Sequence, residues 1–253
     1  MIDRIGHYAR NSLWGYFWQR WKQWSFEHYT LPSAVSHSLE GVTLSLEGLS
    51  LCMKRAILKG AYEKAEIAIS RKLIREGDNI LELGGAIGFV GLFCLTQMKA
   101  SRVISVEANP ETAEQLKHNY GINQRLPEFI VAAVSASDGT AEFNVGAEFW
   151  EDSLTSRSEH LRRIAVRTIS LPSLLNEAKC CFSCLLIDVE GAEAEIGWES
   201  VPSSVETIII EIHPELVGFP ASFRVLNKFQ NLGFDVICHV GNVYGLKRDG
   251  DCK

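Results

Sequence analysis

Short apolar runs and amphipathic stretches alternate along most of the chain. The apolar runs are rich in Val, Ile and Leu, which is typical of strands buried on both faces of a parallel sheet. We predict such strands at residues 80–83, 103–106, 129–134, 185–189 and 207–212. Apolar positions at helical spacing fall at residues 89–98, 110–120, 171–178, 192–199 and 221–232. The pattern predicts an α/β fold with a doubly wound, mostly parallel seven-stranded sheet.

Further segments with a period of two are predicted to add antiparallel strands. Residues 141–145 and 164–169 form an excursion between two of the parallel strands, and residues 234–239 and 243–247 form a hairpin at the end of the sheet.

The segment ahead of this alternation is predicted to be a helical and hairpin extension. Residues 42–46 and 49–53 alternate around Glu47-Gly48, which indicates a short hairpin, and residues 61–75 have the spacing of a helix.

Trp residues form a stripe near the N-terminus. At about 100° per residue they share one helical face with two other apolar residues. The six are Leu13, Trp14, Phe17, Trp18, Trp21 and Trp24. A helix within residues 10–26 could dock on the domain or on a second copy of the chain, lie at a membrane surface, where Trp beside Lys and Arg is favourable, or cover a substrate as a lid.

Size and charge limit the class of protein. The chain has 253 residues, 46% of them apolar and 22% charged, with a net charge of −6, as in globular proteins with a substantial core. We expect an extension at residues 1–58 and a larger domain at residues 59–253. Without a long basic run, no nucleic-acid partner is expected. The chain shows no secretory signal and no unbroken apolar stretch of ~20 residues, so we expect a cytoplasmic protein that contacts a membrane peripherally at most.

Seven cysteines are scattered along the chain, and only Cys181 and Cys184 form a CxxC pair. A zinc site would need a second ligand pair, so we expect thiols.

Two predicted strands end in residues suited to an adenosine-type ligand. In open α/β sheets, ligands bind beyond the carboxyl ends of the strands. Residues 82–88 read ELGGAIG, a glycine turn that lets a ligand approach the backbone, although a tight turn without a ligand would look similar. Glu107 ends the next strand, where a carboxylate can accept hydrogen bonds from both ribose hydroxyls.

Acidic residues and a histidine follow the later strands. Asp188, Glu190 and Glu193 lie within six residues, and Glu190 and Glu193 could also serve as favourable charges at a helix start. Glu211 and His213 share one side of the next strand end. His213 is either a general base or a hydrogen-bonded core histidine.

Taken in order, these segments resemble the FkbM family of class I methyltransferases. The resemblance rests on Gly60-Ala61-Tyr62-Glu63, ELGGAIG, EANPE at 107–111, Ala133-Val134-Ser135 followed by Asp138-Gly139, and IDVEGAE at 187–193. It implies a Rossmann-like sheet that binds S-adenosyl-L-methionine (SAM), and O-methylation of a sugar, glycan or natural-product small molecule. The implied cofactor-binding residues are Glu82, Gly84, Gly85, Gly88, Glu107, Ala108, Asn109, Ala133, Val134 and Asp188.

In-line methyl transfer to an oxygen requires that the nucleophile be aligned and its proton removed, and the strand-end residues supply candidates for this, whereas Glu63 and Ser153 are supported by family position alone. His213 or Asp188 is the candidate base, with Glu190 or Glu211 orienting it. Glu63, Ser153 and Glu211 are expected on the substrate side. No metal ligand set is predicted, although Mg²⁺-assisted chemistry at the carboxylates stays open.

Two positions depart from the family pattern. Ala86 replaces the asparagine of the usual GANIG turn, and Leu186 stands where many members have lysine. Both departures leave the polarity of the site and its acceptor open.

Three other functions remain as alternatives. An NAD-dependent oxidoreductase would favour a GxGxxG turn, whereas this turn is GGxxG. A non-catalytic, membrane-associated or scaffolding protein would act through the Trp stripe. A nucleic-acid methyltransferase acting on exocyclic amines would be expected to carry an NPPY-type motif, which the chain lacks.

Overall fold

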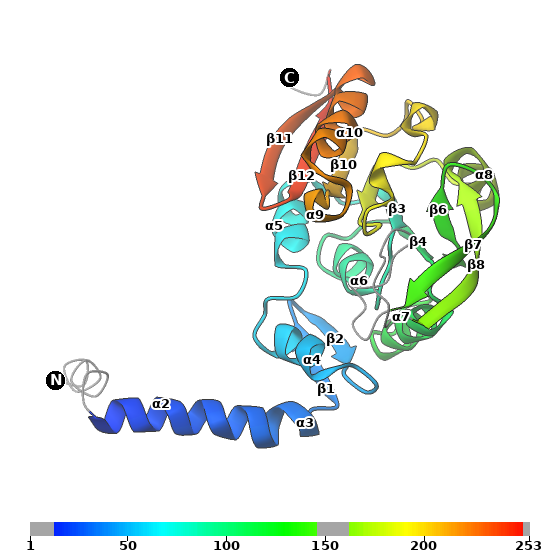
Figure 1. Cartoon of the computed structure of the whole chain (residues 1–253). Helices are drawn as coiled ribbons and strands as arrows, with labels where there is room; N and C mark the ends of the chain where they lie inside the picture. Colours follow the sequence, from blue (N-terminus) through cyan, green and yellow to red (C-terminus); the bar gives the residue numbers. More distant parts are fainter. Residues whose placement is uncertain (1–12, 146–161, 250–253) are drawn as a thin grey trace. The chain divides into compact units, whose positions relative to one another are not determined.

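The computed structural model describes residues 13–145 and 162–249, with side chains from Trp18 onward (Figure 1). It divides into two compact units. One comprises the chain up to His37 together with Leu46–Tyr62, and the other comprises Ser38–Ser45 together with the chain from Glu63 onward. A short strand from the predicted extension therefore belongs to the second unit. Within the described residues, no helix has the length and apolar character of a bilayer span.

The first unit is helical. Helix α2 (Leu13–Ser25) continues through a π-helical turn (Phe26–Thr30) into α3 (Leu31–Ser33), and α4 (Leu51–Leu58) follows later. α3 packs against α4, and Leu31, Met53 and Ile57 are buried.

The predicted hairpin at residues 42–53 is wrong in its second arm. Residues 51–58 are helix α4, whose first turn is capped by the Ser50 hydroxyl oxygen accepting from the Met53 amide at 3.0 Å. Strand β2 (Val42–Ser45) pairs with β1 (Ser36–Leu39) instead. Both residues of the connecting turn have positive φ, +49° at Glu40 and +81° at Gly41, as tight hairpin turns require.

The second unit is built on a seven-stranded sheet, as predicted. Its order is β11-β12-β10-β9-β3-β4-β5, and only β12 runs antiparallel to its neighbours. The strands are β3 (Asn79–Leu83), β4 (Arg102–Glu107), β5 (Phe129–Val131), β9 (Cys184–Ile187), β10 (Thr207–Glu211), β11 (Phe234–Val240) and β12 (Val243–Arg248). β3 lies inside the sheet between β9 and β4, and the chain winds outward from it in both directions.

A three-stranded sheet accounts for the predicted excursion. β7 (Gly139–Val145) pairs antiparallel with β8 (Arg162–Ser170), which pairs parallel with β6 (Ala133–Ser135). The single strand predicted at residues 129–134 is therefore two strands. The chain changes sheets at Ala132, whose amide donates to the Glu107 carbonyl at 3.0 Å.

Helices cover both faces of the main sheet. α5 (Lys64–Leu73), α6 (Phe89–Thr96) and α7 (Pro110–Ile122) pack in succession on one face, and α8 (Leu171–Ala178) and α10 (Phe219–Asn231) contribute to the core of the other (Figure 1). The short α9 (Pro214–Val217) precedes α10. The core of the second face includes Leu81, Leu83, Leu185 and Ile187.

The predicted helix at residues 192–199 is two separate 3₁₀ turns, Ala192–Ala194 and Trp198–Ser200. The Trp198 indole is buried and donates to the Glu193 carbonyl at 2.8 Å, and the Glu193 side chain is buried as well. The burial of the Glu193 carboxylate and the Trp198 indole thus interrupts the helix that the spacing predicted.

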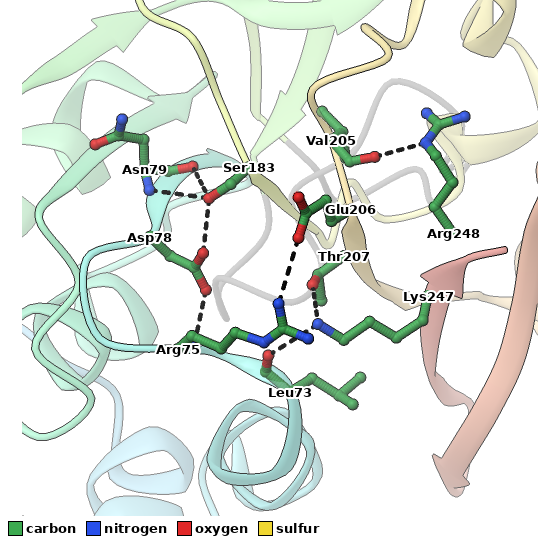
Figure 2. A network of polar contacts seen from close by, with 10 residues as sticks. All are labelled: Leu73, Arg75, Asp78, Asn79, Ser183, Val205, Glu206, Thr207, Lys247 and Arg248. Atoms are coloured by element: carbon green, nitrogen blue, oxygen red, sulfur yellow. Dashed lines mark hydrogen bonds and ion pairs between the residues drawn. The ribbon is translucent and has the colours of Figure 1, made fainter. Parts of the chain in front are cut away.

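A polar network fastens the amino-terminal ends of the central strands (Figure 2). The Ser183 hydroxyl donates to Asp78 at 2.8 Å, and the Lys247 ammonium donates to the Thr207 hydroxyl at 2.6 Å. These contacts join the segments that enter β3, β9 and β10. The carboxyl ends of the same strands carry the residues that the sequence singled out.

Candidate active site

The glycine turn after β3 is pressed against the end of β9. The Gly84 and Gly85 amides both donate to the Val106 carbonyl, at 2.9 and 3.0 Å. Gly84 has a φ of +87°, and a Cβ there would lie 1.6 Å from the Asp188 carbonyl oxygen. Only glycine fits this position, and the turn therefore lies directly beside Asp188.

Glu107 lies on the other side of this turn, at the end of β4. Its Oε2 accepts from the Ala86 amide at 2.9 Å, and its Oε1 accepts from the Asn109 amide at 2.8 Å. The Asn109 side chain in turn caps α7 by accepting from the Glu111 amide at 3.0 Å. The carboxylate is thus held in one orientation by backbone groups. Because a carboxylate can accept about four hydrogen bonds, this arrangement is compatible with a ribose.

Glu82 is buried beneath the turn. Its side chain is 3% exposed, and its Oε2 accepts from the Ser105 hydroxyl. Burial raises the pKa of Glu82 to about 7, although hydrogen bonds from Ser105 and the Gly91 backbone act in the opposite direction. Glu82 therefore braces β3 against β4 and α6, and its predicted contact with a cofactor stays a prediction.

The DVEGAE segment turns sharply after β9. Glu190 has a φ of +46° and Gly191 a φ of +97°. A left-handed glutamate is uncommon and often marks a functional site. Glu193 is fully buried, and its Oε1 accepts from the Gly191 amide at 3.2 Å. Its carboxylate is therefore not a surface charge at a helix start.

His213 joins the ends of β9 and β10. Its side chain is 7% exposed, and its Nδ1 lies 2.7 Å from Glu193 Oε1. Its Nε2 faces the other carboxylates, at 3.6 Å from Asp188, 3.3 Å from Glu190 and 4.0 Å from Glu211. The predicted proximity of Glu211 and His213 is therefore present, and His213 is both hydrogen-bonded in the core and directed into the site.

Crowding changes the protonation of these groups. Burial lowers the pKa of His213, but the hydrogen bond with Glu193 and the charges of Asp188 and Glu190 outweigh it and raise that pKa to about 10. Burial raises the pKa of Asp188 to about 6, although the charge of His213 opposes the shift. Burial, followed by the charge of Asp188, raises the pKa of Glu190 to about 9 and that of Glu211 to about 8.

Asp188, Glu211 and His213 also offer a set of potential metal ligands. One donor atom from each lies within 4.8 Å of those of the other two. They come from the adjacent ends of β9 and β10.

The remaining predicted site residues have different surroundings. Ala133 is buried in β6, and the partly buried Ala108 packs against its small apolar cluster, so the expected adenine side is apolar. Val134 is buried in the main core of the second unit. Glu63 precedes α5 with a φ of +49°. Ser153 lies outside the described residues.

Sequence reasoning missed Glu66. This residue of α5 forms a side-chain hydrogen bond with Glu211, and its charge raises the pKa of both Glu211 and Asp188. A signal was available, because Glu66 lies one helical turn after Glu63.

A family model described as a methyltransferase FkbM domain matches residues 83–236, more than half of the chain. No curated protein matches the chain.

Solved structures with a similar fold have low sequence identity. Fibrillarin from Aeropyrum pernix, with natively bound SAM, is 13% identical with a TM-score of 0.46, and the match covers 72% of this chain and 73% of that one. A precorrin-6y C5,15-methyltransferase from Geobacter metallireducens is 12% identical with a TM-score of 0.44, and the match covers 72% of this chain and 84% of that one. Likeness at this level does not transfer a ligand or a substrate.

Proposed function

The chain belongs to the FkbM family of methyltransferases, and from this premise we propose that it transfers the methyl group of SAM to a hydroxyl oxygen. The proposed acceptor is a sugar, a glycan or another small molecule. When bound, SAM supplies an electrophilic methyl group, so the protein has to align the acceptor and take up its proton.

One observation carries this proposal: the glycine turn lies between Glu107, whose carboxylate can accept hydrogen bonds from a ribose, and Asp188, which belongs to the cluster around His213. The Ala86 amide holds Glu107 on one side, and the Gly84 backbone touches Asp188 on the other. A single turn therefore brings together a carboxylate suited to the ribose and a carboxylate suited to the reacting end of the cofactor. Ala108 and Ala133 belong to one small apolar cluster, which suits the flat, apolar faces of adenine.

Geometry favours Asp188 over His213 as the base. Carboxylates face both ring nitrogens of His213, so the ring serves as a hydrogen-bond donor. Asp188 Oδ1 is buried without a hydrogen-bond partner. We assign proton uptake to Asp188, and we assign to His213, fixed by Glu193, the orientation of that carboxylate.

Turnover of methyl-labelled SAM with hydroxyl-bearing acceptors tests this assignment. Asp188→Asn should lower kcat at least a hundredfold, because general base catalysis contributes typically 10²–10⁴-fold. His213→Ala should also lower kcat, whereas Glu199→Gln, an exposed carboxylate nearby, should not. A loss of less than tenfold in both Asp188→Asn and His213→Ala would remove these residues from the mechanism. Label found on nitrogen or carbon would refute O-methylation.

A further inference from the structure

We propose that Asp188, Glu211 and His213 bind a divalent transition-metal ion of the Mn²⁺ type. The inference extends the proposed function, since the ion would share the site assigned to the acceptor.

The donor geometry is close to that of a mononuclear site. Ligand atoms around one ion, each at about 2.1 Å from it, lie roughly 3 to 4.2 Å apart. The donor atoms of Asp188, Glu211 and His213 all lie within 4.8 Å of one another. Rotation of the partly exposed Asp188 and Glu211 side chains would bring the three donor atoms to this spacing.

Two buried polar groups point to a missing ligand. Asp188 Oδ1 is buried and has no hydrogen-bond partner, although an unsatisfied buried acceptor is costly. The His213 side chain is more than nine-tenths buried, its Nδ1 is hydrogen-bonded to Glu193, and its Nε2 is directed at the other carboxylates.

The Glu193–His213 pair orients the ring as metal-binding histidines are oriented. A ligating histidine usually donates its second ring N–H to a carboxylate or carbonyl, which fixes the tautomer and the ring direction. Here a fully buried Glu193 holds Nδ1 at 2.7 Å. The same contact leaves Nε2 as the nitrogen available to an ion.

The charge balance also favours a cation. Four carboxylates, those of Asp188, Glu190, Glu193 and Glu211, lie within 4.0 Å of one imidazole ring. Among the described residues, the ion pairs of Asp188, Glu193 and Glu211 are all made with His213. Buried charges need partners, and a divalent ion at Nε2 would supply two positive charges in place of one proton.

The mixed donor set selects the kind of ion. Carboxylates suit Mg²⁺, Ca²⁺ and Mn²⁺, whereas imidazole suits later transition metals, so two carboxylates with one imidazole favour an ion of intermediate character. Three protein ligands leave positions open for an oxygen of the acceptor. An ion there would lower the pKa of that hydroxyl and so ease the loss of its proton.

Mn²⁺ binding to the full-length protein tests the site without SAM or acceptor. After metal is stripped with a chelator and the chelator removed, free Mn²⁺ is followed by its electron paramagnetic resonance signal. We expect one Mn²⁺ per chain. Glu211→Gln should weaken this binding at least tenfold, whereas Glu215→Gln, an exposed glutamate four residues away, should leave it unchanged. Circular dichroism verifies folding, and Asp188→Asn replaces Glu211→Gln if the latter is unfolded.

The outcomes separate this inference from the proposed function because SAM is titrated independently. Absence of Mn²⁺ binding by the unaltered protein overturns the inference. Equal Mn²⁺ affinity in the ligand variants and in Glu215→Gln overturns it as well. If SAM still binds in either case, the proposed function stands. Mn²⁺ binding without SAM binding would support the metal site and count against the methyltransferase proposal.

Discussion

Glu82 makes the stability of the protein depend on pH. Its pKa in the folded protein is raised from 4.5 to about 7, so the folded state holds this proton more tightly than the unfolded state does. The resulting stabilisation is complete below pH 4.5 and is lost as the pH rises through about 7.

We therefore expect Glu82→Gln to remove part of this pH dependence. The free energy of unfolding of the unaltered protein should fall, relative to that of the variant, by roughly 3 kcal/mol between pH 4.5 and 8. Urea unfolding of both proteins at several pH values measures this, with the exposed Glu76→Gln as the control. Parallel curves for the unaltered protein and Glu82→Gln would show that Glu82 is not the group responsible.

Ala86 has a strained backbone conformation, which the asparagine usual at this position in the family indicates only indirectly. Its φ is +42°, in the left-handed region that Gly and Asn tolerate better than Ala. The asparagine found at this position in many family members is therefore explained by backbone conformation as well as by polarity. Ala86→Gly and Ala86→Asn should each raise the free energy of unfolding, by roughly 0.5–1 kcal/mol. Thermal unfolding of the two variants and the unaltered protein measures this change. A lowered midpoint in both variants would contradict the left-handed conformation of Ala86.

Several residues of the site could be placed from the sequence, and others could not. Glu107, Asp188, Glu211 and His213 were located because they follow apolar runs that read as strands. The inward direction of Glu193 could not be read, because it depends on His213, twenty residues further along. Contacts of this kind are set by the packing of β9 against β10, and the local pattern of residues does not predict them.

The turn between β3 and α6 is the element on which the site depends most. Gly84 and Gly77 both have positive φ, +87° and +89°, but only a Cβ at Gly84 would meet other atoms, the backbone of Asp188. Substitution of Gly77 therefore measures the cost of backbone strain alone, whereas substitution of Gly84 adds a steric clash.

We expect Gly77→Ala to cost roughly 1–2 kcal/mol of stability and to leave SAM affinity unchanged. Gly84→Ala should cost more and abolish SAM binding, because β3 and β9 would have to separate. Chemical unfolding and calorimetric titration measure the two effects. Equal effects of the two substitutions would mean that the contact between Gly84 and Asp188 is not critical.

Helices and strands were predicted well where sequence periodicity determines the conformation, and poorly where tertiary contacts determine it. The seven strands of the main sheet were expected, since short apolar runs rich in β-branched residues are typical of strands buried on both faces. Residues 49–53 alternate like a strand, but the Ser50 cap and the packing of Met53 make them helical. Residues 192–199 have helical spacing, but the burial of Glu193 and Trp198 divides them.

At the scale of the whole molecule, the aromatic stripe of α2 belongs to the first unit, whereas the residues of the proposed site belong to the second. Trp18, Trp21 and Trp24 are 55%, 54% and 47% exposed, and the rings of Trp18 and Trp21 stack at 5.2 Å. A membrane surface, a second copy of the chain and the substrate are the three partners that the sequence suggested for this stripe.

Because every residue assigned to the cofactor belongs to the second unit, replacing Trp18, Trp21 and Trp24 together with Ser should change the Kd for SAM less than twofold. Calorimetric titration measures this. A large loss of affinity would assign the helix to the site, as a lid would require.

The most direct test of the whole account is a titration of the purified protein with SAM, its demethylated product and NAD, followed by unfolding and by heat of binding. A ligand that binds only the folded state, at a hundred times its Kd, adds about 2.7 kcal/mol of stability. We predict that SAM and its product stabilise the protein, that NAD does not, and that Glu107→Ala abolishes the effect. Failure of both SAM and its product to bind would contradict the account and turn attention to the aromatic helix.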